Sequence, residues 1–422
     1  MTAPDTGAAG RSAAVRFVFV TVVLDVLAMG VIIPVLPQLI KDFMGGDTVR
    51  AATLYGVFGT VWALMQFVCS PIVGMLSDRF GRRKVILLAN FGLGLDYLVM
   101  ALAPSVGWLF VGRVISGITG ATWTTAGAYI ADVTPREKRA AGYGLIGAAF
   151  GLGFVLGPAF GGVLGATSPR LPFWVAGALT LVNAAYGTFV LPESLPPEKR
   201  RPFDWRRANP VGSLALLRSH HELFGMAAVQ LLYFVAHNAM PSVFVLYAGY
   251  RYGWNARDVG LTLALVGVCT TIVQGGLVRR LVPRMGERRA VLAGLACGTV
   301  SFLIWGLAPS GKLALLAIPF GAFMGLYGPA AQGIMSHRVD PGEQGQLQGA
   351  LSSMMGICGM IAPPIFTQTF AKFIDPNGVH APGAPLVLSG LLTAIALVIA
   401  LRVTRGVRSS HADAPPSTPH PA

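Results

Sequence analysis

Runs of about twenty apolar residues recur along the chain and constrain its fold most, because a helix of that length crosses the hydrocarbon core of a membrane. Charged residues make up only 12% of the sequence, against about 25% in an ordinary soluble domain. The pattern predicts an all-α integral membrane protein. We expect twelve transmembrane helices, at residues 16–39, 52–76, 85–103, 106–130, 139–165, 172–191, 223–248, 257–281, 289–308, 312–335, 346–371 and 384–404.

The positive charges are distributed unevenly between the loops on the two sides of these spans. A formal net charge of +14 would suggest a nucleic-acid partner in a soluble protein. If the N-terminus is cytoplasmic, however, Lys and Arg gather in the inner loops and both tails, and only Arg113 lies deep within a span. The positive-inside rule thus predicts a multi-pass protein of the bacterial inner membrane. Both termini are expected in the cytoplasm, with the lipid bilayer as a partner and no nucleic acid.

The chain is predicted to consist of two related halves. RFGRRK at Arg79–Lys84 recurs as RMGERR at Arg284–Arg289, 205 residues later, and a Pro- and Arg-rich interruption at 192–222 separates the two copies. Parallel repeats of this kind enclose a central cavity between two bundles. The expected organisation is a cytoplasmic tail (1–15), a six-helix bundle (16–191), a cytoplasmic linker (192–222), a second six-helix bundle (223–404) and a disordered cytoplasmic tail (405–422).

The sequence shows no pattern for a cofactor, a metal or covalent catalysis. It has no Gly-Lys-Ser/Thr loop for nucleotide phosphates, and the spans hold no Ser/His/Asp constellation and no cluster of metal ligands. The four cysteines lie within the spans, without the paired spacing of a metal site, and we interpret them as packing residues. We therefore expect no enzyme, no cofactor and no metal site, with an ion gradient as the energy source.

Charged residues within the spans are the most informative, because a full charge inside a bilayer is costly and marks a functional pathway. Asp25 lies nine residues after Arg16, roughly 14 Å along a helix and near the midplane. An ionised carboxylate there needs water, a cation or a proton, so Asp25 is a candidate for proton coupling. Asp96 and Arg113, on consecutive helices, form either a static ion pair or a charge held for substrate or proton. His237 is either a further coupling group or a neutral packing residue.

The loop after the second span carries the segment GMLSDRFGRR at Gly74–Arg83. Gly81 permits a tight turn, and the arginines can hold an inner gate or lie at lipid headgroups. Asp132, at the inner end of the fourth span, is a candidate partner for Arg82, and with Asp78 they would form a charged latch. The alternatives are a basic anchoring loop and a solvated Asp132. The candidate gate residues are Gly74, Asp78, Arg79, Gly81, Arg82, Arg83 and Asp132.

The fifth span is rich in glycine at regular spacing. Such glycines let helix backbones approach closely, and a proline among them removes one backbone hydrogen bond and allows a bend. The segment is therefore either a shaped contact with directional meaning or ordinary close packing. The residues concerned are Gly144, Gly153, Gly157, Pro158, Gly161 and Gly162.

These motifs resemble those of a known family. The inner-loop segment is similar to the signature of the major facilitator superfamily, and the glycines of the fifth span are similar to the motif of its antiporters. Four further segments resemble tetracycline/proton antiporters, and the resemblance covers nearly the whole chain, most strongly in the first half. They are LDVLAMGVIIPVLP around Asp25, ALMQF at Ala63–Phe67, LDYLVMA around Asp96 and GRVISGITGAT at Gly112–Thr122.

The resemblance implies the major facilitator fold and a division of roles. Asp25, Asp96 and Arg113 would serve coupling and substrate binding. Gln66 and Gln274 would face a substrate cavity. The family's eighth-helix histidine and ninth-helix aspartate, a polar pair used in tetracycline export, correspond here to Thr270 and Gly298, so the second half departs from the pattern.

These observations lead to a functional expectation. We expect a secondary active transporter, working as a monomer, that exports a hydrophobic or amphiphilic drug-like small molecule in exchange for protons by alternating access. Two alternatives remain at this stage. One is a proton-coupled importer or facilitator of a small metabolite, and the other is a membrane sensor that does not transport.

Overall fold

The computed structural model describes residues 8–120, 123–134, 139–200, 202, 216, 223–340 and 343–405. These residues form helices and no strand. The first half contains α1 (Ala8–Ile32), α2 (Leu36–Phe43), α3 (Thr48–Phe80), α4 (Arg82–Leu102), α5 (Val106–Gly120), α6 (Trp123–Val133), α7 (Arg139–Thr167) and α8 (Leu171–Val190), followed by the short η2 (Pro197–Lys199). The second half contains α10 (Phe224–His237), α11 (Ala239–Tyr252), α12 (Ala256–Ile272), η6 (Val273–Leu277), α13 (Val278–Met285), α14 (Glu287–Leu307), α15 (Gly311–Ala314), α16 (Ala317–Phe323), η7 (Met324–Leu326), α17 (Tyr327–Ser336), α18 (Gln344–Ile374) and α19 (Ala384–Val403).

Eleven helices or continuous runs of helix in the described residues are long and apolar enough to cross a membrane. The one expected span that is not among these eleven is the fourth, 106–130. It corresponds to α5 and α6, which are separated by residues 121 and 122, and these two residues lie outside the described part. Most of the expected linker and all of the tail after residue 405 also lie outside it. The all-α membrane fold predicted from the sequence is confirmed.

Several expected spans are broken rather than continuous helices. The first is interrupted around Pro34, between α1 and α2, and the seventh at Asn238, three residues before Pro241. Proline lacks an N–H group and fits best in the first turn of a helix, where Pro37 of α2 and Pro241 of α11 lie. Proline alone does not break a span, since α3, α7 and α18 contain prolines in their interiors. The eighth span passes through η6, a π-helical segment that contains Gly275 and Gly276. Hydropathy alone shows an apolar run but not such changes in backbone hydrogen bonding.

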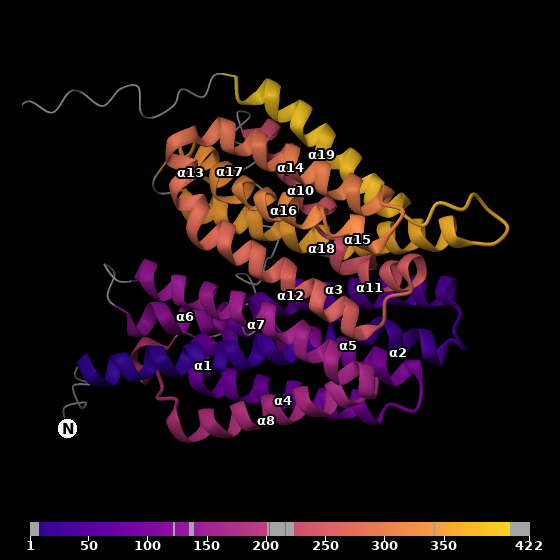
Figure 1. Cartoon of the computed structure of the whole chain (residues 1–422). Coiled ribbons are helices and arrows are strands. Elements are labelled where there is room, and N and C mark those ends of the chain that lie inside the picture. Colours follow the sequence, from indigo (N-terminus) through magenta and orange to yellow (C-terminus); the bar gives the residue numbers. More distant parts are fainter. Residues whose placement is uncertain are drawn as a thin grey trace, which may run out of the picture.

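The helices form two bundles, α1–α8 in the lower part of Figure 1 and α10–α19 in the upper part. The two bundles meet where α3 packs against α18 and α7 packs against α12. Both ends of this assembly have short turns, which serve as landmarks. We call the end with the turns at Gly81 and Gly286 the basic end, because arginines surround both turns, and the end with the turns at Gly45 and Gly253 the opposite end.

The contact between the bundles, here called the seam, is closest toward the opposite end. A Cβ atom on Gly162 of α7 would lie 2.9 Å from the Cα atom of Gly260 of α12, closer than real Cβ atoms come. On the other helix pair, the Thr60 hydroxyl of α3 donates a hydrogen bond to the Met360 carbonyl of α18 at 2.9 Å. Where Gly162 meets Gly260 the backbones touch directly, as small residues permit.

Toward the basic end the described helices of the two bundles are packed less closely. A Cβ atom on Gly74 of α3, Gly147 of α7 or Gly276 of η6 would meet nothing within 4 Å. In Figure 1 the described helices of the two bundles diverge toward the end that carries α6 and α13.

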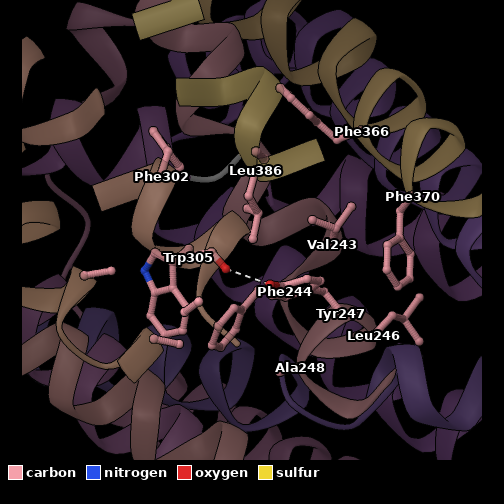
Figure 2. Close-up of a cluster of buried hydrophobic side chains, with 14 of the residues drawn as sticks. Val243, Phe244, Leu246, Tyr247, Ala248, Phe302, Trp305, Phe366, Phe370 and Leu386 are labelled. Atoms are coloured by element: carbon pink, nitrogen blue, oxygen red, sulfur yellow. Dashed lines mark hydrogen bonds between the residues drawn. The ribbon is translucent and has the colours of Figure 1, made fainter. Parts of the chain in front are cut away.

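A cluster of buried aromatic and aliphatic side chains holds the opposite end of the second bundle together (Figure 2). Phe244 of α11 packs edge-to-face on Trp305 of α14, with ring centroids 5.0 Å apart. The buried Tyr247 hydroxyl donates a hydrogen bond of 2.6 Å to the Trp305 carbonyl. Ala52 of α3 belongs to the same cluster and is fully buried. The second bundle thus offers a firm surface against which α3 closes.

Candidate functional site

A pocket lies within the first bundle, between α1, α3, α4 and α5. Three of its lining residues, Asp25, Gln66 and Arg113, are among those singled out in the sequence. The others follow at helical spacing, since Met29 is one turn after Asp25 and Trp62 one turn before Gln66. The position one helical turn from a polar residue within a span was thus a usable signal. The full lining is Asp25, Met29, Trp62, Gln66, Leu93, Tyr97, Arg113, Ser116 and Gly120.

The Asp25 carboxylate lies half-buried at the pocket and is held from behind by an amide. Asn183 of α8, which is fully buried, donates from Nδ2 to Asp25 Oδ1 at 2.9 Å and to the Thr21 carbonyl at 3.1 Å. Asn90 of α4 lies beside the same carboxylate. A neutral donor fixes the position of the carboxylate without neutralising its charge, and Asp25 also lines the pocket.

Asp96 is in a different setting from Asp25. Its side chain is 1% exposed, and both carboxylate oxygens are buried without a hydrogen-bond partner. It lies against α5, where a Cβ atom on Gly112 would be 2.8 Å from Asp96 Oδ1. A buried polar group without a partner costs free energy, and an unpaired carboxylate costs far more than a protonated one. Asp96 thus differs from Asp25, which has an amide donor and lines the pocket.

The static ion pair between Asp96 and Arg113, one of the two alternatives drawn from the sequence, is not formed. No salt bridge joins Arg113 to Asp96 or Asp25 among the described residues, because Arg113 extends along the pocket. Its Nη2 contacts the Met100 sulfur at 3.9 Å, and its Nε is buried without a partner. The guanidinium is thus a cation at the pocket with donors left over for a ligand.

At the basic end of the first bundle, Arg82 joins the two acids expected of the latch. Its Nη1 lies 2.5 Å from Asp78 Oδ1, and its Nε lies 3.3 Å from Asp132 Oδ2 at the end of α6. Gly81, with φ of 101°, makes the turn between α3 and α4 that places Arg82 there. The other two arginines of this segment make contacts of their own. Arg83 donates to the Thr188 carbonyl of α8, and the Arg79 guanidinium lies 5.2 Å from the centre of the Phe80 ring.

The first residues after α8 complete this latch, and sequence reasoning missed them. Glu193 accepts hydrogen bonds from the backbone N–H of Arg82 at 2.8 Å and of Leu195 at 3.1 Å. Ser194 donates to Asp132 Oδ2 at 3.1 Å. Glu193 therefore caps the first turn of α4, where a negative charge is favourable. No local pattern reveals a cap that lies 111 residues away in the sequence.

The second bundle has a related pair with its charges reversed. At the same 205-residue offset, Arg82 corresponds to Glu287 and Asp132 to His337. His337 Nε2 lies 3.6 Å from Glu287 Oε1, beside the turn at Gly286, whose φ of 80° resembles that of Gly81. The repeat thus keeps the position of the pair while exchanging acid and base.

The remaining candidates of the second bundle lie on α12, η6, α14 and α10. Thr270 is half-buried, and Gln274 is exposed and packs against Gly325 of η7. Gly298 is buried, and a Cβ atom there would lie 2.9 Å from the Met324 sulfur. The place of the family's aspartate is therefore filled by a thioether. His237, at the end of α10, is exposed, makes no hydrogen bond to a described residue and stacks on Tyr233.

The glycines of the fifth span serve two contacts. Gly153, Gly157 and Gly161 face α1, where a Cβ atom on Gly157 would lie 2.6 Å from the Gly30 Cα atom. Gly162 and the Pro158 carbonyl face α12 at the seam. Gly144 lies in the part of α7 whose side-chain surroundings are outside the described residues. One helix thus fixes the position of α1, which carries Asp25, and meets the other bundle.

Comparison with known proteins agrees with this architecture. The family model described as Major Facilitator Superfamily matches residues 18–363 and, in a second match, residues 280–419. The chain is 38% identical to the class C tetracycline resistance protein of Escherichia coli over 83% of this chain and 88% of that protein. It is 34% identical to the class B protein of Escherichia coli, over 84% and 88%.

Among solved structures, a bacterial homologue of the human lysosomal transporter Spinster, in an inward-facing and unoccupied conformation, has a TM-score of 0.75. It is 18% identical, and the alignment covers 94% of this chain and 98% of that chain. The helical fold, the pocket with its charged side chains and these matches define a multi-pass membrane transporter and not an enzyme. The chain belongs to the major facilitator superfamily.

Proposed function

We propose that the protein exports a hydrophobic or amphiphilic drug-like molecule in exchange for protons, by alternating access to the pocket of the first bundle. The observation that carries this proposal is Asp25, a carboxylate held by Asn183 and open to a pocket that also holds Arg113 and Gln66. Such a group can bind a proton when the pocket faces one side and release it on the other. The names of the class C and class B relatives support export of a drug.

The orientation follows from the charges. The basic end, with Arg79, Arg82 and Arg83 in one half and Arg284, Arg288 and Arg289 in the other, is the cytoplasmic end under the positive-inside rule. The closed seam then lies on the outer side, and the pocket is open to the cytoplasm. This is the state in which an exporter takes up its substrate.

The test uses inside-out membrane vesicles that respiration has acidified, and a compound identified by a susceptibility panel in an efflux-deficient host. Export into the vesicle lumen in exchange for protons should dissipate part of the pH gradient when the compound is added. Vesicles without the protein provide the control. An unchanged gradient, together with growth on a nutrient that depends on the protein, would instead indicate an importer.

Asp78→Asn is expected to lower transport at least tenfold while leaving substrate binding within about twofold. The ion pair with Arg82 lies at the basic end, away from the pocket, and Arg82 keeps its second acid, Asp132, at 3.3 Å when Asp78 is neutralised. Its role is therefore conformational. Initial transport rates and equilibrium binding of the same compound are the measurements.

Asp47→Asn is the matched control for this substitution. Asp47 caps α3 at the opposite end by accepting from the Arg50 N–H at 3.0 Å, and asparagine caps equally well. It should transport like the parent protein. Loss of binding in well-folded Asp78→Asn protein would contradict the latch assignment.

A further inference from the structure

The second bundle carries a stack of three aromatic rings that the proposed coupling does not use. Tyr233 of α10 stacks on Tyr327 of α17, with ring centroids 4.1 Å apart and planes inclined by 27°. On the same helix, His237 lies nearly parallel to Tyr233, at 5.7 Å and 11°. Tyr327 is fully buried, and its hydroxyl donates to Gln230 Oε1 at 2.9 Å. The stack is thus anchored at the Tyr327 end and exposed at the His237 end.

The exposed end of the stack points into the protein rather than toward lipid. Phe224 and Leu231 are the exposed large apolar residues of α10 and, seven positions apart, share one face of the helix. At about 100° per residue, Tyr233 lies about 200° around the helix from Leu231, and His237 about 240°. The two rings therefore lie on the face away from the outward-facing apolar residues.

A hydrogen bond between the two bundles allows the depth of His237 along the helices to be compared with that of the pocket residues. The Tyr55 hydroxyl of α3 donates to the Pro241 carbonyl of α11 at 3.2 Å. Going from that contact toward the basic end, His237 is four residues from Pro241, or about 6 Å, and Trp62 is seven residues from Tyr55, or about 10 Å. His237 therefore lies at the depth of the Gly59–Trp62 stretch of α3, whose Trp62 lines the pocket of the first bundle.

We propose that His237 and Tyr233 form the second wall of the substrate site and select planar, fused-ring aromatic compounds by stacking. The inference deepens the proposed function and depends on it for the identity of the site. Recognition by ring faces suits this half, because the nearest described side chain to Gly298 is Met324, a thioether and not a carboxylate. Stacked aromatic pairs gain free energy beyond that of the area they bury, and a planar ring system makes the best use of both walls.

The experiment measures binding to the full-length protein in lipid nanodiscs, without a proton gradient. The two probes are ethidium, which is planar and fused, and tetraphenylphosphonium, which carries the same single positive charge on rings that are not coplanar. The parent protein should bind ethidium more tightly. His237→Leu should weaken ethidium binding about tenfold, equal to about 1.4 kcal/mol, and change tetraphenylphosphonium binding less than twofold.

Three variants make the result specific. His237→Phe keeps a flat ring and should bind ethidium within about twofold of the parent, even though it cannot carry a proton. Tyr233→Leu removes the ring beneath His237 and should reproduce the loss of ethidium binding. Leu231→Ala, on the outward-facing side of the same helix, should change neither probe. Thermal unfolding of each variant establishes that it is folded.

Equal weakening of both probes by His237→Leu, or no weakening of ethidium binding, overturns the inference. So does a parent protein that shows no preference for ethidium or binds neither probe. Because no proton gradient is present, the outcome is separate from that of the vesicle assay. Selective ethidium binding without proton exchange in the vesicle assay would support the role of His237 and Tyr233 in binding and contradict the proposed proton antiport.

Discussion

Asp25→Asn is expected to abolish uphill, proton-driven accumulation of substrate in inside-out vesicles while substrate binding and folding persist. Asparagine resembles the protonated carboxyl but cannot exchange a proton. Its Oδ1 can still accept the hydrogen bond from Asn183 that now reaches Asp25 at 2.9 Å, so the packing of α1 on α8 is kept. The backbone near Asp25 is interrupted around Pro34, which allows α1 to adjust. Downhill exchange of substrate should remain measurable.

Two variants complete this experiment. Asp25→Glu keeps a titratable group and should retain part of the activity. Asp42→Asn applies the same change to an exposed acid at the opposite end, which pairs only with Gln38 at 3.0 Å, and should behave like the parent protein. Full uphill transport by well-folded Asp25→Asn protein would transfer the coupling role to Asp96 or His237.

Gly162→Leu is expected to open the seam and lower transport by one to two orders of magnitude. A side chain at this position meets the α12 backbone, since even a Cβ atom would lie 2.9 Å from Gly260 Cα. Overpacking of this kind costs about 1–3 kcal/mol, which corresponds to a shift of about 5- to 150-fold between two states. The closed state at the opposite end is destabilised, whereas the state with the seam open is not.

A single reporter cysteine measures this shift. Ala52 is fully buried against the second bundle, so Ala52→Cys in a cysteine-free background should react slowly with a polar maleimide and about tenfold faster after Gly162→Leu. Gly147→Leu is the matched control, on the same helix, because a Cβ atom there meets nothing within 4 Å. Equal labelling rates in the two leucine variants would mean that the seam does not depend on Gly162.

Sequence reasoning found those parts of the site that depend on a residue's own type or on a short motif around it. Asp25 and Arg113 stand out because charges are rare in apolar spans, and the Arg82 contacts follow from a turn at Gly81. Asn183 and Glu193 were missed for the same reason: each acts on a residue more than a hundred positions away, and only the packing of α8 brings them there.

Gly30, Pro34 and Pro37 indicated a loosened backbone in the first span, but the breaks in the seventh and eighth spans were missed, for a different reason. An apolar run predicts burial in the membrane but not where the backbone hydrogen bonds change. Pro241 was a usable signal for the break at Asn238, since proline is best accommodated in the first turn of a new helix. The π-helical segment at η6 has no comparable signal beyond its two glycines.

The glycine contacts at the seam have a further consequence for the energetics of the proposed cycle. Where Gly162 meets Gly260, the touching atoms belong to the backbone, so no side-chain rotamer is frozen when the surfaces meet and none is released when they part. Burying a long side chain instead costs up to about 2 kcal/mol in lost conformational entropy. This contact therefore adds little conformational-entropy difference between the closed and open forms. Its contribution to the free-energy difference between the two forms should then change only weakly with temperature.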